Sequence, residues 1–159
     1  MSNIIGCVYY DGTATVDYFG DSRVKNNFMK YYDKISQKLS PNDFKLTLQN
    51  NMYDVHIEKR DYQVVYCVVT KSCKMRLAWL LVDDIFSQIQ VNHIILKKLI
   101  SKWNNPENDK ISLINAKIDQ VKQEMMINID KILERGEMFG DLVESTEQMA
   151  TNAVIFKHG

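Results

Sequence analysis

Hydrophobic and polar positions follow two different patterns along the chain, and the pattern changes near residue 104. Before that point, alternating and continuous apolar runs predict β-strands, and stretches with a period close to 3.6 residues predict helices. From residue 110 onward one helical pattern runs to the end without proline or strand-like alternation. We therefore expect a mixed α/β domain followed by a long helical segment.

The first hundred residues predict the element order β-β-α-β-β-β-α-α. Asp11-Gly12 is typical of a two-residue hairpin turn, and the run VVYCVV predicts a central strand that is covered on both faces. Ser72 is the expected N-cap of the helix that follows this strand. The fold class is α/β, with a five-stranded antiparallel sheet between helices. Strands are predicted at 4–10, 13–18, 44–48, 52–59 and 62–70, and helices at 25–39, 73–88 and 91–103.

A polar, proline-containing stretch with the sequence NNPEND separates the two parts. This stretch places the α/β domain at residues 1–104 and a linker at 105–110. The remaining residues, 111–159, form the helical segment.

Positions spaced alternately by three and four residues run through the helical segment without a stutter, and eleven of the fourteen are apolar. This 3.5-residue period is the signature of a left-handed coiled coil, because a helix that packs on its own domain needs a shorter stripe of period 3.6. The fourteen positions of this seam are Ile111, Ile114, Ile118, Val121, Met125, Asn128, Ile132, Arg135, Phe139, Leu142, Thr146, Met149, Ala153 and Phe156.

Two polar residues, Asn128 and Arg135, interrupt the middle of the seam. A buried guanidinium offers five fixed donors and is costly when unpaired, so Arg135 requires acceptors from other helices. Such a polar layer fixes register and oligomeric state. Gly136 and Gly140 lower the intrinsic helix propensity, so we expect the segment to be ordered by partner helices.

A second apolar stripe lies beside the seam, at Met126, Ile129, Leu133 and Val143. One interpretation is a wide core face of the helix. The other is a surface that docks onto another part of the molecule, such as the N-terminal domain.

Composition excludes several function classes. The formal net charge is zero, which argues against a general surface for nucleic acid or anionic membranes. Cys7, Cys67 and Cys73 have neither disulfide nor metal spacing, so we expect free thiols and no metal. The three histidines are scattered and no phosphate-binding glycine loop occurs, so we expect neither an enzyme nor a cofactor. The longest apolar runs are far shorter than the ~20 residues of a membrane span.

Residues 127–146, INIDKILERGEMFGDLVEST, resemble the centre of the synaptobrevin-type R-SNARE motif. The aliphatic-Asp-Lys-aliphatic-Leu-Glu-Arg run of that family stands here at 129–135, which places Arg135 on the family's ionic layer. The first half is similar to a longin domain, the profilin-like fold that precedes this motif in long vesicle SNAREs. The chain is thus identified as a longin-type R-SNARE of the synaptobrevin family.

The resemblance implies a vesicle-side SNARE that drives membrane fusion. Arg135 would bind the carbonyl groups of three glutamine-type SNARE helices, and the bundle would assemble from Ile111 toward Phe156. The longin domain would serve regulation and sorting, through coat or regulatory proteins or through a closed state in which the SNARE segment folds back onto it. A groove for that segment is expected between the first helix and the strand at 44–48, with walls at Phe28, Tyr32, Phe44 and Leu46.

The expected location is the cytoplasmic face of vesicles or endomembranes. Because the chain stops at Gly159, two layers before the family's membrane anchor, it is expected to be a soluble cytoplasmic part without that anchor. An alternative is a longin-like trafficking adaptor or tether with a homodimeric coiled coil. Pairs of buried Arg135 side chains would oppose a parallel homodimer of that kind.

Overall fold

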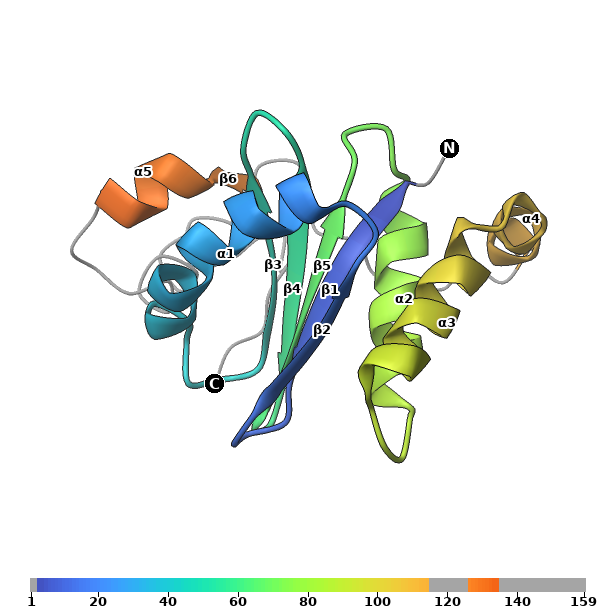
Figure 1. The fold of residues 1–159 in the computed structure, drawn as a ribbon, viewed down its shortest axis with the longest axis horizontal. Coiled ribbons are helices and arrows are strands. Elements are labelled where there is room, and N and C mark those ends of the chain that lie inside the picture. The colour runs from blue at the N-terminus through green and yellow to red at the C-terminus, as the bar shows by residue number, and fades with distance from the viewer. Residues whose placement is uncertain (1–2, 115–125, 135–159) are drawn as a thin grey trace, which may run out of the picture.

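The computed structural model describes residues 3–114 and 126–134. In these residues a six-stranded sheet has the order β2-β1-β5-β4-β3-β6 (Figure 1). The first five strands pair in antiparallel fashion, as predicted, and the sixth is parallel to β3. The strands are β1 Ile4–Tyr10, β2 Thr15–Phe19, β3 Phe44–Gln49, β4 Asp54–Arg60, β5 Gln63–Val69 and β6 Met126–Asn128.

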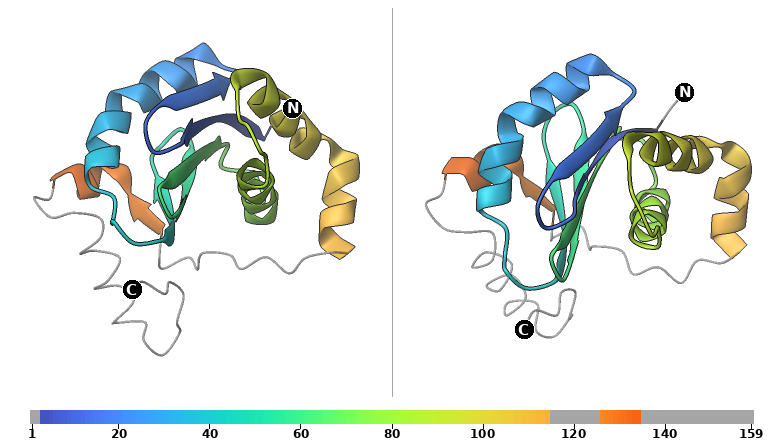
Figure 2. Two further views of the ribbon diagram at one scale, coloured as in Figure 1. Left: turned by 90° about the horizontal axis from the view of Figure 1, so that it is seen from below. Right: turned by 60° about the horizontal axis from the view of Figure 1, so that its bottom comes forward.

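Helices cover both faces of the sheet, which gives the three layers predicted from the sequence (Figure 2). Helix α1 packs on one face, and α2 and α3 pack on the other as a helical hairpin. Helix α4 follows α3 directly, whereas α5 follows β6 and lies beside α1. Their bounds are α1 Ser22–Gln37, α2 Met75–Phe86, α3 His93–Asn104, α4 Pro106–Ile114 and α5 Ile129–Glu134.

The first hairpin forms at the Asp-Gly signal, but the turn is longer than the predicted two residues, because β2 begins at Thr15 rather than at Thr13. The Asp11 carboxylate accepts hydrogen bonds from the backbone N–H groups of Thr13 and Ala14, at 2.8 Å each. Gly12 has a φ of 105°, a conformation that side chains with a Cβ rarely adopt. The turn thus sets the register in which Cys7 of β1 lies opposite Tyr18 of β2.

The helix cap predicted from the sequence differs from the caps observed. The expected cap at Ser72 is wrong, because α2 begins at Met75 and its N-cap residue Lys74 makes no side-chain cap. Asn92 caps α3 instead, and its side-chain oxygen accepts a hydrogen bond from the N–H of Ile95 at 2.9 Å.

The core follows the apolar runs. Strand β5 occupies the middle of the sheet, and all its residues after Gln63 are buried. On the α1 face, Phe28 packs against the rings of Tyr32, Tyr53 and Tyr66 with centroid distances of 6.1–6.3 Å. These rings join α1 to the β3–β4 turn and to β5.

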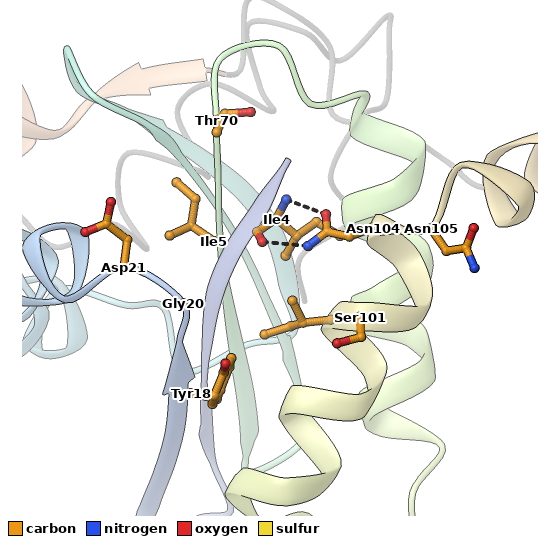
Figure 3. Close-up of a pocket in the computed structure, with 10 residues that line it drawn as sticks. Ile4, Ile5, Tyr18, Gly20, Asp21, Thr70, Ser101, Asn104 and Asn105 are labelled. Atoms are coloured by element: carbon orange, nitrogen blue, oxygen red, sulfur yellow. Dashed lines mark hydrogen bonds between the residues drawn. The ribbon is translucent and has the colours of Figure 1, made fainter. Parts of the chain in front are cut away.

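Asn104, the last residue of α3, ties the end of this helix to the start of β1 (Figure 3). Its side-chain oxygen accepts from the N–H groups of Asn3 and Ile4, at 3.1 and 2.8 Å, and its amide donates to the Ile4 carbonyl at 2.9 Å. A cleft of about 520 Å³ adjoins this contact, between the start of β1 and the C-terminal half of α3.

The structure after residue 104 differs from the predicted linker and continuous helix. Most of the residues expected as a linker, 105–110, lie in α4, although the domain boundary itself remains a prediction. The single helical pattern expected from residue 110 onward is wrong at 126–128, which form β6. The edge of β3 offers unpaired backbone groups there, and Met126 and Ile127 fit a strand as well as a helix. No helix of the described residues is long and apolar enough to span a bilayer.

Candidate functional site

The segment 126–134 lies against the edge of the N-terminal domain. Strand β6 pairs with β3 so that Met126, Ile127 and Asn128 stand opposite Thr47, Leu48 and Gln49. The side-chain amide of Gln49 also approaches the Met126 sulfur, at 3.4 Å. A part of the predicted coiled-coil segment therefore extends the sheet by strand addition.

Asn128 ends this strand and starts the next helix. Its side-chain oxygen accepts a hydrogen bond from the N–H of Asp130 at 2.8 Å and a longer one from Lys131 at 3.4 Å. This is the geometry of an N-cap, which satisfies donors of the first helical turn that have no partner within the helix. Asn128 itself is exposed. Its position next to an Ile-Asp dipeptide is a helix-start signal that the heptad count obscured.

Helix α5 buries two isoleucines against the domain. Ile129 is fully buried and Ile132 is 2% exposed, and both belong to the same apolar cluster as the strands of the sheet. Ile127 and Leu133 are partly buried against it. Ile129 and Leu133 belong to the second predicted stripe, so in the described residues this stripe faces the N-terminal domain.

Tyr53 marks the polar border of this contact. Its hydroxyl donates to the Asn27 side chain at 2.6 Å, which links the β3–β4 turn to α1. Burial raises the pKa of Tyr53 to about 12, and the nearby carboxylate of Asp130 also acts in the raising direction. The phenol therefore stays neutral and remains a hydrogen-bond donor at any physiological pH.

The predicted groove residues lie on the α1 face and at β3. Phe28 and Leu46 are fully buried, Phe44 is 5% exposed, and Tyr32 is half-buried at an edge-on angle of 65° to Phe28. They form part of the core that supports β3. Their assignment as groove walls remains a prediction.

The predicted seam is described at four of its fourteen positions. The backbone of Ile111 and Ile114 is helical in α4, Asn128 is the cap described above, and Ile132 is buried. The other ten lie outside the described residues: Ile118, Val121, Met125, Arg135, Phe139, Leu142, Thr146, Met149, Ala153 and Phe156.

An ion-pair clamp, which no sequence pattern predicted, holds α4 to the start of α2. Asp109 accepts from Lys74 at 2.9 Å and from Arg76. The hydrogen bond from Lys74, together with that from Arg76, lowers the pKa of the Asp109 carboxyl below its ordinary value. The clamp fixes the beginning of the predicted seam near the N-terminal domain.

A buried polar pair lies on the other face of β3, and sequence reasoning treated its histidine as scattered. The Thr47 hydroxyl is 2.8 Å from Nδ1 of His56, and the imidazole packs against Trp79 of α2 with a centroid distance of 5.1 Å. Burial lowers the pKa of His56 to about 4, so the ring is neutral. No group of metal-ligating side chains occurs within residues 3–114 and 126–134.

Comparison with protein families matches residues 110–159 to the Synaptobrevin family. Over the whole length, the chain is 25% identical to vesicle-associated membrane protein 713 of Arabidopsis thaliana, covering 97% of this chain and 78% of that protein. It is 24% identical to vesicle-associated membrane protein 7 of Homo sapiens, covering 82% of this chain and 68% of that protein. The chain is a homologue of the longin-type R-SNAREs.

This longin-type R-SNARE homology spans both halves of the chain, and the observed α/β fold is that of a longin domain. It supports a vesicle SNARE role in membrane trafficking, as expected from the sequence. Synaptobrevin-family proteins are SNAREs that carry no enzymatic activity. SNARE proteins act in complexes, so the homology also implies SNARE partners in general.

Proposed function

We propose that this R-SNARE homologue contributes one arginine-layer helix to a parallel four-helix bundle that drives fusion of a vesicle with its target membrane. The observation that carries the proposal is the Synaptobrevin match over residues 110–159, with Arg135 in the middle of a mainly apolar heptad seam. Three glutamine-type SNARE helices are the other members of the bundle. The guanidinium of Arg135 donates to their side-chain carbonyls, which removes the cost of an unpaired buried charge.

Assembly runs from Ile111 toward Phe156 and draws the two membranes together. Each large apolar side chain that enters a layer contributes about 1.5–3 kcal/mol of burial free energy. The protein thus works on the cytoplasmic face of vesicles or endomembranes without catalysis or cofactor. Its longin domain serves sorting and regulation, and it offers a surface to coat or regulatory proteins.

Regulation follows from two incompatible uses of residues 126–134. In the bundle these residues are one continuous helix with Asn128 and Ile132 in layers. In the structure, residues 126–128 are a strand and Ile132 is buried against the N-terminal domain. Because one segment cannot adopt both arrangements, docking of 126–134 opposes assembly, and release of this segment permits it.

Thermal melting of the assembled complex tests the proposal. The 159-residue chain, mixed with three glutamine-type SNARE helices, is expected to form a helical complex that melts cooperatively. Arg135→Glu removes the five guanidinium donors and buries a carboxylate without a counter-charge, so it is expected to cost about 3–5 kcal/mol of complex stability. Glu134→Gln is the matched control, because it changes the adjacent residue outside the seam.

Equal melting temperatures for Arg135→Glu and Glu134→Gln would contradict the arginine layer. Sedimentation of the chain alone separates the alternative function. A stable homodimer that ignores the glutamine-type helices would identify a trafficking adaptor with a homodimeric coiled coil instead. In a fusion assay, excess of the 159-residue chain is expected to compete with a membrane-bound R-SNARE for partner helices.

A further inference from the structure

Two isoleucines protrude from the loop that joins α2 and α3. Ile89 is fully exposed in the loop and Ile94 is 53% exposed in the first turn of α3. Single exposed apolar residues are ordinary, but these two lie five positions apart at the tip of one helical hairpin. The tip is at the lower end of the molecule in Figure 1.

The solvent-facing side of α3 continues from Ile94 as a basic surface. Lys97, Lys98, Ser101 and Lys102 are all exposed, and their spacing of three, four, seven and eight residues from Ile94 puts them on one side of the helix. The opposite side carries the buried Leu96 and Ile100. No acidic residue occurs in α3, so this surface is cationic although the whole chain is neutral.

Two lysines of this surface, Lys97 and Lys98, form no ion pair with a carboxylate of the described residues. Asp84 of α2 accepts from Lys102 at 2.9 Å and from the Trp103 indole at 3.1 Å. Lys97 lies over the Tyr18 ring, 6.0 Å from its centroid.

We propose that the surface formed by Ile89, Ile94, Lys97 and Lys98 docks the longin domain on a membrane with anionic lipids. The two isoleucines insert at the level of the headgroups, and the two ammonium groups bind lipid phosphates and carboxylates. Apolar residues next to lysines on one helical face are the pattern of interfacial membrane binding. The attraction of each lysine to an anionic leaflet is small, so the contact is weak and reversible.

The position of this surface agrees with such a role. Helix α3 packs beside β2 and β1 at one edge of the sheet, whereas β6 and α5 lie at the other edge (Figures 1 and 2). Docking on a bilayer through α3 therefore leaves the 126–134 segment accessible in either of its arrangements. The cleft beside Asn104 is a poor headgroup site by comparison, because the Asp21 carboxylate lines it.

Flotation of the 159-residue chain with lipid vesicles tests the inference. Binding is expected to vesicles of phosphatidylcholine with phosphatidylserine, and to be much weaker to phosphatidylcholine alone. Ile89→Ser/Ile94→Ser is expected to lower the partition coefficient roughly tenfold, because buried apolar area is lost. Lys97→Ala/Lys98→Ala is expected to lower it by a similar factor on anionic vesicles, and raising the salt concentration should remove that difference.

Matched controls come from the opposite side of the molecule. Lys30 and Lys34 are exposed one turn apart on α1, and Met52 is an exposed apolar side chain in the β3–β4 turn. Lys30→Ala/Lys34→Ala and Met52→Ser are expected to keep full binding. Slower amide exchange of residues 87–98 in the presence of anionic vesicles gives an independent readout that does not depend on the variants.

Three outcomes would overturn the inference: absence of binding to anionic vesicles, equal losses in the controls, or unchanged exchange at residues 87–98. If the isoleucine variant instead lost a protein partner while vesicle binding stayed intact, the surface would be a protein-docking site. None of these results depends on bundle formation, so they leave the proposed fusion function untouched.

Discussion

Ile127 of β6 lies directly opposite Leu48 of β3, in a parallel register. Parallel pairing means that the segment runs along the edge in the same direction as β3 and enters α5 immediately afterwards. This pairing satisfies backbone groups that an edge strand otherwise leaves open. The same pairing prevents residues 126–128 from being helical. Single substitutions outside the seam can therefore shift the balance between the docked segment and the helix of the proposed bundle.

Ile129→Ala is expected to release the docked segment. Ile129 is fully buried against the domain but is not a seam position, so truncation leaves a cavity in the docked state alone. Loss of a buried isoleucine side chain costs about 2–5 kcal/mol. Hydrogen exchange of residues 126–134 should become faster, and partner helices should bind faster.

The neighbouring Lys131→Ala is the control for this experiment, because Lys131 is exposed and also lies off the seam. It is expected to leave both rates near those of the parent chain. Unchanged exchange in Ile129→Ala would mean that the contact of α5 contributes no stability.

Asn128→Ala should favour the bundle over the docked state. Alanine removes the cap of α5, which costs about 1 kcal/mol in the docked state. In the proposed bundle, alanine is a better helix former and removes a polar residue from a layer. Partner helices are therefore expected to bind roughly fivefold faster, as measured by stopped-flow mixing. Slower binding would show that the Asn128 side chain has a needed partner in the bundle.

Asp109→Asn should loosen α4 from α2. The pKa of Asp109 is lowered in the folded state, so the charged carboxylate stabilises the clamp at any pH above its ordinary value of 3.8. This stabilisation is lost as pH falls through the lowered pKa. Amide exchange in α4 should be faster in Asp109→Asn than in the parent chain at neutral pH, and the two should converge in acid.

Salt gives the second test of this clamp, because partly exposed ion pairs are screened. Added salt should accelerate α4 exchange in the parent chain and have little effect on Asp109→Asn. Glu107→Gln is the matched control on the same helix. Its carboxylate is 3.9 Å from the Lys110 ammonium and both side chains are exposed, so this pair is expected to contribute little.

His56 is expected to make the domain less stable in mild acid. The pKa of His56 is about 4 in the folded state, against an ordinary value of 6.5. Between these two pH values the imidazole is protonated in the unfolded chain but not in the folded chain. The free energy of unfolding is therefore full above pH 6.5 and falls by about 3 kcal/mol as pH drops toward 4. Urea titration across this range measures the slope.

The double variant Thr47→Val/His56→Phe should flatten that slope. It removes the titrating ring and its hydrogen-bond partner together, which leaves no buried hydroxyl unsatisfied. A slope that persists in the double variant would assign the acid sensitivity to another group.

Sequence patterns predicted the longin part well because local signals and tertiary context agree there. The Asp11-Gly12 turn, the alternation in β3 and the apolar run in β5 each determine their element without reference to distant residues. Asn92 rather than Ser72 caps a helix, since capping depends on backbone conformation at single residues. The hydrophobic periodicity of a segment therefore does not determine which residue caps its helix.

The contacts of residues 126–134 could not be predicted from the heptad pattern. A period of 3.5 describes the helix that partner chains would stabilise, whereas Ile127 pairs with an edge strand that lies almost eighty residues earlier in the chain. The second stripe, with Ile129 and Leu133, predicted a face that docks onto the N-terminal domain, and these two residues do pack there. The Asp109 clamp had no local signal, because its partners lie on α2.

Asn104 joins the last helix of the sheet domain to its first strand, across a separation of 100 residues. The strand that is synthesised first therefore completes its surroundings last. At about 5–20 residues per second, the ribosome needs roughly 5–20 s to make the segment up to Asn104. During that interval β1 lacks β5 until Val69 has been made and lacks α3 until the end, so its apolar run is open to chaperones. Substitutions at Asn104 should thus reduce the yield of newly made protein more than the stability of protein that has already folded.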